Sequence, residues 1–228
     1  MSNVIELKGI SKTYKTGEIE VNAVKNISFS VKKGEFSAIA GPSGSGKTTL
    51  LNMMSGLESA TQGEVILAGK SIATMSSSAL SDFRREHIGF IFQSYNLIPV
   101  LSVQENIEYI MLLQGISKDE RRHRVAKILT EVGLAGTEKR FPPQLSGGQQ
   151  QRVAVARAIV SHPDIILADE PTANLDSHAG SDLLNMMKKL NENRGVTFLF
   201  STHDSMIMER AKRLITLHDG EVNSDITK

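Results

Sequence analysis

Eight consecutive residues form the clearest chemical pattern in the sequence: Gly41-Pro42-Ser43-Gly44-Ser45-Gly46-Lys47-Thr48. An apolar run over 36–40 precedes them, and the residues over 49–54 after them are compatible with a helix. Phosphate groups need several donors close together, and glycines let the backbone turn its N–H groups inward at a helix N-terminus. The pattern G-x-x-x-x-G-K-[ST] between a strand and a helix therefore predicts a phosphate-binding loop; the alternative is a flexible Gly/Ser loop that matches by chance.

The residue types in this phosphate loop (residues 41–48) indicate separate roles. Lys47 is expected to hold the β- and γ-phosphates of a nucleotide, and the Thr48 hydroxyl is expected to bind Mg²⁺. Backbone N–H groups of the loop are expected to donate to the remaining phosphate oxygens. The residues of this region predicted to bind the nucleotide are Gly41, Pro42, Ser43, Gly44, Ser45, Gly46, Lys47, Thr48 and Thr49.

Two adjacent carboxylates, Asp169 and Glu170, end the apolar run over 165–168. If that strand lies beside the strand before the phosphate loop, Asp169 comes close to Thr48 and can hold Mg²⁺ directly or through water. Glu170 would then face the γ-phosphate, where it can orient the attacking water or accept its proton. The alternative is a pair of acids that only closes a strand and caps the next segment of the chain.

A second Gly-rich segment, Leu145-Ser146-Gly147-Gly148-Gln149, leads directly into a helical run. Ser146 followed three residues later by Gln149 fits an ordinary helix start, which is the simpler interpretation. Two glycines in the first turn are nevertheless poor helix formers, and a cap does not require them. They leave N–H groups and the positive end of the helix dipole open to a second phosphate, so we predict that Ser146, Gly147, Gly148 and Gln149 contact nucleotide.

The elements that must position these residues are read from apolar periodicity. Short strands are predicted over 4–9 and 20–31, with a turn at Gly17-Glu18 between them, and they precede the phosphate loop as a small antiparallel sheet. Helices are predicted to start at Ser102 and Ser117, with no strand between them. After Pro142-Pro143, apolar strands alternate with helices, which predicts a parallel sheet covered on both faces. The alternating elements are helix 149–160, strand 165–168, helix 177–193, strand 196–201, a helix from about 206, strand 213–217 and the Asp219-Gly220 turn.

Composition excludes several classes of protein. The chain of 228 residues has a formal net charge of +1 and no cysteine, so nothing indicates nucleic-acid binding and thiolate metal sites are excluded. The longest run without Asp, Glu, Lys or Arg, over 87–104, contains Gln93, Asn96 and Pro99, which argues against a membrane span. We therefore expect a chain that is soluble on its own, with the basic cluster over 121–124 on a solvated helix face. Contact of that cluster with anionic lipid is the alternative.

Taken together and in order, these motifs resemble the nucleotide-binding subunit of an ABC transporter over essentially the whole chain. The resemblance rests on the phosphate loop, Gln93, the segment 145–149, the acidic pair, Asn174-Leu175-Asp176 and His203. The segments over 90–99 and 149–152 are similar to the lipoprotein-release, macrolide-export and cell-division group. The implied fold is α/β: a P-loop NTPase core with a mainly parallel sheet, an antiparallel β subdomain and an inserted α-helical lobe. One ABC ATPase domain over 1–228 is implied, with the lobe at about 95–160 inserted in a RecA-like core.

Further roles rest only on the resemblance. Tyr14, placed after the first strand, matches the aromatic residue that stacks on adenine, with a plain edge-strand tyrosine as the alternative. Gln93 matches the glutamine that contacts Mg²⁺ and the attacking water, His203 the histidine that contacts the γ-phosphate, and Asp176 the aspartate that meets the partner subunit. The implied catalytic residues are thus Glu170, His203, Lys47 and Gln93, and the implied metal ligands are Thr48, Gln93 and Asp169. Ala173 departs from the group, which usually has Gly there, without removing a catalytic group.

The resemblance also implies partners. Two subunits would pack head to tail around two ATP molecules, each pocket taking its phosphate loop from one chain and residues 146–148 from the other. Separate transmembrane permease subunits would hold the ATPase at the inner face of the cell membrane, on the cytoplasmic side. They are expected to dock near 93–101, where Leu97, Ile98, Val100 and Leu101 either form that contact or pack the lobe itself.

Two other functions fit the residues less well. A soluble ABC-type ATPase in DNA repair or translation would generally carry coiled coils, zinc modules or a duplicated motif set, and this chain has no heptad runs, cysteines or second set. A kinase that uses the same phosphate loop is disfavoured by the segment 145–149 and by Glu170. A kinase would transfer phosphate to an acceptor, whereas an ATPase releases it.

Overall fold

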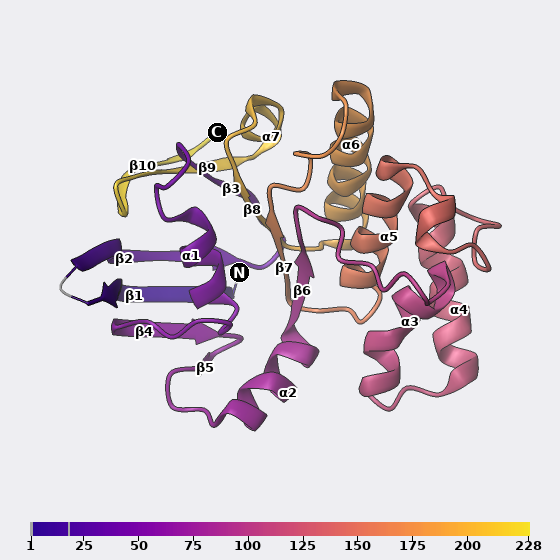
Figure 1. The fold of residues 1–228 in the computed structure, drawn as a ribbon, viewed down its shortest axis with the longest axis horizontal. Coiled ribbons are helices and arrows are strands. Elements are labelled where there is room, and N and C mark those ends of the chain that lie inside the picture. Colours follow the sequence, from indigo (N-terminus) through magenta and orange to yellow (C-terminus); the bar gives the residue numbers. More distant parts are fainter. Residues whose placement is uncertain (1, 18) are drawn as a thin grey trace.

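The computed structural model describes residues 2–17 and 19–228 and contains two sheets (Figure 1). A four-stranded antiparallel sheet has the order β2-β1-β4-β5, and a six-stranded sheet has the order β10-β9-β3-β8-β7-β6. In the second sheet only the β9–β10 pair is antiparallel. The strands are β1 (Asn3–Thr16), β2 (Ile19–Lys32), β3 (Phe36–Ala40), β4 (Gln62–Leu67), β5 (Lys70–Ser71), β6 (Ile88–Ile91), β7 (Ile165–Asp169), β8 (Phe198–Thr202), β9 (Arg213–His218) and β10 (Glu221–Thr227).

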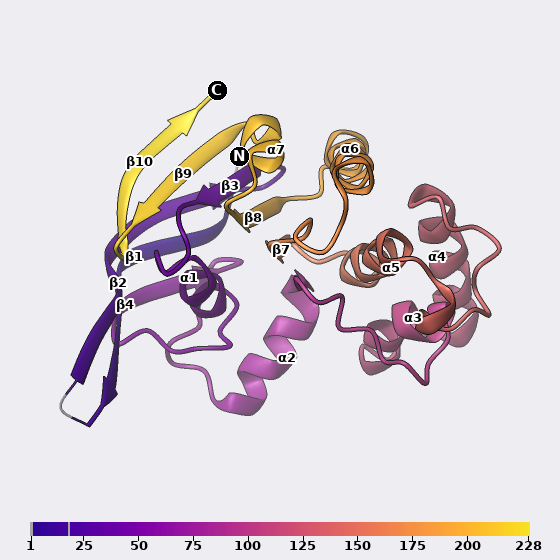
Figure 2. The same ribbon diagram turned by 45° about the horizontal axis from the view of Figure 1, so that its top comes forward.

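Helices cover both faces of the six-stranded sheet, as expected for a largely parallel sheet (Figure 2). They are α1 (Lys47–Met54), α2 (Ser77–His87), α3 (Val103–Leu113), α4 (Lys118–Glu131), α5 (Gly147–Ile159), α6 (Ser177–Arg194) and α7 (Ser205–Arg210), with a 3₁₀ turn over Pro142–Gln144. The predicted mixed α/β class, with an antiparallel sheet beside a mainly parallel one, is confirmed.

Successive residues of the central strands point to opposite faces, which divides the core in two. On one face, Ile39, Leu167 and Leu199 pack with the apolar side chains of α1 and of the antiparallel sheet. On the other face, Ala38 and Phe200 pack with the apolar side chains of α3, α4, α5 and α6. Helices α1 and α5 therefore lie on opposite sides of the same sheet, as Figure 2 also shows.

Polar residues immediately before the helices explain where the helices begin. The Ser102 side chain accepts from the backbone N–H of Glu105, and the Glu105 carboxylate accepts from the backbone N–H of Ser102, so the predicted capping box is present. Ser117 caps α4 through one bond, in which its hydroxyl accepts from the N–H of Glu120. Each cap satisfies an N–H group that has no partner inside the helix.

Several element boundaries differ from the prediction. Strands β1 and β2 form one long hairpin, so Tyr14 lies inside β1 and not after it. Helix α2 was not predicted: it buries only Phe83, which leaves too little apolar periodicity to recognise. Helix α5 begins at Gly147, two residues early, because the Ser146 cap includes both glycines in the helix. Of the predicted turn at Gly17-Glu18, Glu18 lies outside the described residues.

The basic cluster over 121–124 is only partly the solvated face that we expected. Arg121 is mostly buried, donates to the Ile116 carbonyl and lies 3.6 Å from the Glu108 carboxylate of α3. Arg122 and His123 are exposed, and Arg124 pairs with Glu120 one turn earlier. Arg121 is therefore a contact between α3 and α4. Within residues 2–17 and 19–228, no helix combines the length and apolar character needed to cross a membrane.

Candidate nucleotide-binding site

The phosphate loop leaves β3 and enters α1 through backbone conformations that suit glycine. Gly44 and Gly46 have φ of 81° and 97°, values that L side chains rarely adopt. A Cβ atom on Gly46 would lie 2.3 Å from the Ala23 carbonyl oxygen, and one on Gly41 would lie 2.3 Å from that of Leu217. The loop is thus held tightly between β2 and β9, with its exposed residues facing outward from the sheet edge.

Lys47 is held inside this loop and is only 7% exposed. Its Nζ donates to the carbonyl oxygens of Gly41 and Pro42, at 2.7 and 2.9 Å. These bonds use two of the three ammonium donors. In the described part of the chain Lys47 forms no ion pair, so a buried positive charge remains uncompensated until an anion binds.

Asp169 reaches Thr48 from β7, which is not the neighbour of β3 that we predicted, because β8 lies between the two strands. It shares a strand face with Ile165 and Leu167, which pack in the core that contains α1. The Thr48 Oγ1 lies 3.2 and 3.4 Å from the two Asp169 carboxylate oxygens. A hydroxyl and a carboxylate side by side are the hard oxygen donors that Mg²⁺ prefers, so these residues fit the predicted metal site.

Glu170 and His203 lie in contact at the ends of β7 and β8. The Glu170 Oε1 is 2.8 Å from His203 Nδ1, and its Oε2 accepts a 3.3 Å bond from the Thr202 hydroxyl. Glu170 has a φ of 45°, an uncommon backbone conformation for a residue with a side chain. Two side chains that were predicted to act at the γ-phosphate are therefore brought together at one sheet edge.

Tyr14 lies beside the loop, on the antiparallel sheet. Its side chain is 38% exposed, and the Lys12 ammonium lies 5.1 Å from the ring centroid. Burial raises the pKa of Tyr14 and the Glu58 carboxylate raises it further, whereas the side chain of Thr49 opposes the shift. Tyr14 and Thr49, which were both predicted to bind nucleotide, are thus neighbours, and the ring keeps an accessible surface for stacking.

The second Gly-rich segment, residues 145–149, is called the signature segment from here on. It starts α5 with a complete capping box. The Ser146 hydroxyl accepts from the Gln149 N–H at 3.3 Å, and the Gln149 side chain accepts from the Ser146 N–H at 3.0 Å. Within the described ranges, no hydrogen bond joins Ser146, Gly147 or Gly148 to the phosphate loop. Because α5 and α1 cover opposite faces of the sheet, the two predicted phosphate-binding elements of one chain do not meet.

The loop that carries Gln93 is hydrogen-bonded to the loop that leads to Asp176 and α6. Gln93 is exposed after β6, and its carbonyl oxygen accepts a 2.9 Å bond from the Asn174 side chain. Asp176 caps α6, and the bond from the Ala179 N–H is the main cause that lowers the pKa of its carboxyl. Ala173 does not have a positive φ, so the Gly of the resembling group is not needed here.

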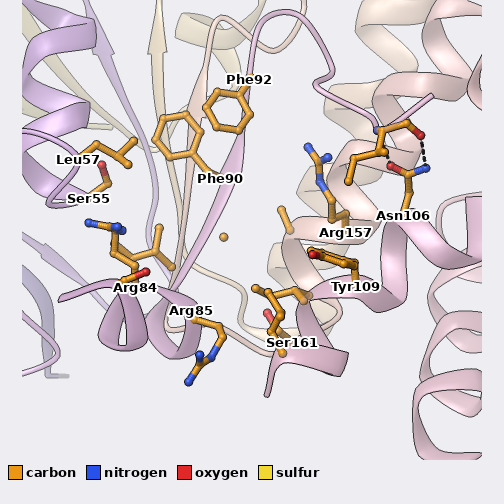
Figure 3. A pocket seen from close by; sticks show the side chains of 17 residues that line it. Ser55, Leu57, Arg84, Arg85, Phe90, Phe92, Asn106, Tyr109, Arg157 and Ser161 are labelled. Atoms are coloured by element: carbon orange, nitrogen blue, oxygen red, sulfur yellow. Dashed lines mark hydrogen bonds between the residues drawn. The ribbon is translucent and has the colours of Figure 1, made fainter. Parts of the chain in front are cut away.

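An apolar cleft of about 420 Å³ opens beneath the loop that follows β6 (Figure 3). Phe90 and Phe92 lie between Leu57 on one side and Arg157 and Tyr109 on the other. Ile98 at its rim is 39% exposed, and Val100 nearby is 80% exposed. Leu97 instead packs against the core, so the apolar residues over 97–101 divide between lobe packing and exposed surface.

Two residues that contact the site's loops were missed from the sequence. Gln151 is buried on α5, and Tyr95 follows Gln93 with a φ of 44°. The only signal for Gln151 was a polar residue on the inward face of an apolar helix. The residue type of Tyr95 does not predict its positive φ.

Comparisons with known proteins agree with this geometry. A family described as "ABC transporter" matches residues 24–173. The macrolide export ATP-binding/permease protein MacB of Escherichia coli is 45% identical over 225 residues, which cover 99% of this chain and 35% of MacB. The chain thus spans about a third of the length of the MacB relatives. The uncharacterised ABC transporter ATP-binding protein MJ1508 of Methanocaldococcus jannaschii is 45% identical over 99% of this chain and 100% of its own length.

Solved structures are equally similar. The ATP-binding cassette MJ0796, in a dimeric post-hydrolysis state bound to ADP and Pi, superposes with a TM-score of 0.89 at 43% identity, covering 98% of each chain. CbiO1 of Clostridium perfringens, part of the ABC transporter complex CbiONQ, also gives a TM-score of 0.89, at 26% identity. The family match covers most of the chain and the structural match nearly all of it. The chain therefore belongs to the ABC transporter family, as an ATP-binding cassette that is an ATPase.

Proposed function

We propose that this chain is the ATP-hydrolysing motor subunit of a membrane ABC complex, and that it dimerises head to tail on ATP to change the conformation of separate membrane subunits. One observation carries the proposal. The helices that follow the phosphate loop and the signature segment cover opposite faces of one sheet, which separates the two segments within a chain, so we infer that a single ATP reaches both only if they come from two chains.

A two-fold dimer makes this arrangement symmetric. Each chain contributes the phosphate loop to one pocket and residues 146–148 to the other, so the ligand itself joins the two surfaces. The backbone N–H groups and the dipole at the start of α5 favour the triphosphate of the partner. Hydrolysis and loss of phosphate remove the charge that holds the halves together. The dimeric state of MJ0796 supports this assembly.

Within each pocket the residues divide the reaction. Lys47 compensates the charge of the β- and γ-phosphates, and Thr48 and Asp169, with Gln93, would hold Mg²⁺. When bound, that ion supplies charge neutralisation at the phosphate oxygens. Glu170 orients the attacking water and accepts its proton, while His203 holds the carboxylate in place and reaches toward the γ-phosphate.

The cleft shown in Figure 3 is the proposed contact with the membrane subunits. It lies where α3 and α5 approach β6, and its apolar lining suits an inserted helix or loop. We place it between a core and an inserted helical lobe at about 95–160, within a single ABC ATPase domain over 1–228. MacB relatives, which are ATP-binding/permease proteins, support a membrane partner, and with it a position at the cytoplasmic face of the membrane.

The dimer is tested with Glu170→Gln, which should bind ATP without completing hydrolysis. On a sizing column with light-scattering detection, this variant should run as a dimer with ATP and as a monomer without nucleotide. A variant that stays monomeric in ATP while wild-type hydrolysis is normal would contradict the head-to-tail proposal.

The membrane contact is tested separately with Ile98→Glu at the rim of the cleft. In cells, this variant should leave the membrane fraction and lose its co-purifying membrane protein, while ATPase activity of the isolated chain is kept. Val222→Glu, at a partly exposed position on β10, is the matched control. Equal membrane association of both variants would place the contact elsewhere.

A further inference from the structure

We propose that Gln151 is a positioning residue for hydrolysis, which ties the start of α5 to the two loops that carry Gln93 and Glu170. The positioning role concerns one chain, whereas the communication between pockets that follows from it rests on the proposed dimer. Gln151 lies one turn after Gly147, so it moves with the signature segment of its own helix.

The contacts of the Gln151 carboxamide point to both loops. Its side chain is 0% exposed, and its Nε2 donates to the Pro171 carbonyl oxygen at 2.7 Å. The same nitrogen lies 3.5 Å from the Phe92 carbonyl oxygen, a longer bond. Pro171 directly follows Glu170, and Phe92 directly precedes Gln93. One buried amide therefore reaches the backbone next to two residues of the proposed catalytic set.

The bond to Pro171 matters because of the backbone at Glu170. A φ of 45° is sparsely populated for a residue with a side chain, and such a conformation persists only where surrounding contacts hold it. Proline fixes its own φ, so the bond to its carbonyl restrains the peptide unit that follows Glu170, while the Glu170 N–H is held by the Ser201 carbonyl at 2.9 Å. Without the amide, Glu170 would sample positions from which it does not align the attacking water.

The burial of Gln151 carries a cost that packing does not explain. Its Oε1 is buried without a hydrogen-bond partner among the described residues. An apolar side chain of the same length would avoid that penalty. A polar group kept in an unfavourable place between three functional segments indicates that its donor bonds serve the site.

The two loops are also bonded to one another and to α5, so they respond together. The Asn174 side chain donates to the Gln93 carbonyl at 2.9 Å, and the Tyr95 hydroxyl donates to the Asn174 carbonyl at 3.3 Å. Arg157 of α5 donates to the Tyr95 carbonyl at 2.9 Å. A shift of α5, when its first turn binds the partner's ATP, is thereby transmitted to Glu170 of its own pocket.

Asn191 provides a matched control elsewhere in the fold. It is a buried amide, 4% exposed, whose Nδ2 also donates to two carbonyls, those of Gly34 at 2.9 Å and Val196 at 2.8 Å. These carbonyls lie just before β3 and β8, at the sheet edge opposite the nucleotide site. Loss of this amide has the same chemistry without the same location.

The experiment compares Gln151→Met with Asn191→Leu, each of which replaces the amide by an apolar group of similar size. Both should lower Tm. Only Gln151→Met should lower kcat, by about 10-fold or more, since small misplacements of catalytic groups have such effects. It should leave ATP affinity within about twofold, because its side chain does not touch bound phosphate, and should reduce the Hill coefficient for ATP toward 1.

Gln151→Glu separates positioning from folding. A buried carboxyl is neutral below its raised pKa and can still donate one bond to the Pro171 carbonyl. Its kcat should therefore be partly restored at low pH relative to Gln151→Met, and should fall as pH rises and the carboxyl ionises. If Gln151→Met does not fold, the pH dependence of kcat in Gln151→Glu is compared with that of the wild type, and a fall in their kcat ratio as pH rises remains the expected result.

Three outcomes are distinguishable. If Gln151→Met and Asn191→Leu lose the same stability and both keep wild-type kcat, Gln151 only supports the fold and the inference is wrong. If Gln151→Glu has the low, pH-independent kcat of Gln151→Met, the donor bond is not the cause and the inference is also wrong. If Glu170→Gln stays monomeric in ATP, the proposed dimer fails, and a kcat loss confined to Gln151 still supports its positioning of Glu170.

Discussion

The two segments of this chain that are predicted to bind phosphate differ in how complete they are. The phosphate loop is assembled with groups from three strand ends, and its lysine, hydroxyl and carboxylates already lie within hydrogen-bond reach of neighbours in the same chain. The signature segment has the same glycine chemistry, but within the described ranges its hydrogen bonds stay inside the segment, its own helix and the 3₁₀ turn before it. In the proposed dimer, the phosphate loop is therefore a nearly complete site, whereas the signature segment is a surface that completes a site only on contact with the partner chain.

The difference has a physical origin in the sheet. Alternate side chains of the central strands pack against α1 on one face and against α5 on the other, although both helices start near the carboxyl ends of the strands. A second copy is the simplest source of the missing wall, because a two-fold axis presents each start of α5 to the opposite phosphate loop. Variants that damage one element and spare the other test this division.

The largest expected effect is on kcat, for a variant in the half of the pocket that contains the phosphate loop (the completed half). Glu170→Gln should lower kcat by about 10²–10⁴-fold, the range for loss of a general base, while nucleotide affinity stays near wild type. Steady-state phosphate release and nucleotide titration measure the two quantities. Glu35→Gln, which removes a carboxylate that pairs with Arg213 away from the site, is the control and should keep kcat. Normal turnover in Glu170→Gln would remove Glu170 from the mechanism.

A substitution in the signature segment should weaken ATP-dependent dimerisation. A Cβ on Gly148 would lie 3.5 Å from the Ala179 Cβ, an ordinary contact, so Gly148→Glu should fold, and an acid in the first turn suits the helix dipole. Its carboxylate would face the partner's triphosphate, and like charges cost several kcal/mol, so dimerisation in ATP should weaken by about 100-fold or more. Sedimentation of each variant in ATP measures the dimer fraction. The control Lys118→Glu, in the first turn of α4, should dimerise normally.

Mixing provides the sharpest form of that test. A mixed dimer of Gly148→Glu and Lys47→Ala chains has both defects in one pocket and neither in the other. Activity should therefore return when two inactive preparations are combined. Mixtures that remain as inactive as their components would show that each chain completes its own pocket.

Lys47→Ala should weaken ATP binding itself. The substitution removes the buried ammonium and leaves the phosphate charge uncompensated. Truncation of one partner of a buried charge pair reduces the binding free energy by about 2–5 kcal/mol. Fluorescent nucleotide titration measures the change, and Lys8→Ala, at an exposed salt bridge to Glu64, serves as control. Unchanged affinity would mean that Lys47 contacts no ground-state phosphate.

The smallest expected effect belongs to the base. Tyr14→Ala should weaken nucleotide binding by about 0.5–1.5 kcal/mol, the range for an aromatic pair, and Tyr14→Phe should keep wild-type affinity. The measurement is the affinity of each variant for ATP and for a triphosphate without a base. Equal losses for both ligands would favour the alternative of an edge-strand tyrosine that only packs β1.

Much of the completed half could be predicted from the sequence because it is local. A strand, a Gly-rich turn and a helix are contiguous over 36–54, so residue types alone specify how Lys47 and Thr48 are presented. The capping boxes at Ser102 and Ser146 are equally local, and both are present as predicted. The contact between Asp169 and Thr48 is present, but the premise that their strands are neighbours is wrong, because β8 lies between β3 and β7.

The features that were not predicted depend on tertiary contacts. Helix α2 has one buried residue, so its boundary signals were too weak against a Ser-rich start. Arg121 turns inward because Glu108 and the Ile116 carbonyl are nearby in space, which helical spacing does not reveal. The bonds of Gln151 connect three segments, and no single window of the sequence contains them.

The alternation of β7 also limits how this protein can change in length. Ile165 and Leu167 pack on one side and Ile166 and Ala168 on the other, and Asp169 follows the first pair toward Thr48. Deleting one residue inside the strand would reverse this parity, so that the aspartate would face the wrong core together with half of the aliphatic side chains. Within β7, only insertions or deletions of an even number of residues keep Asp169 on its present face. The connecting loops are not subject to this constraint.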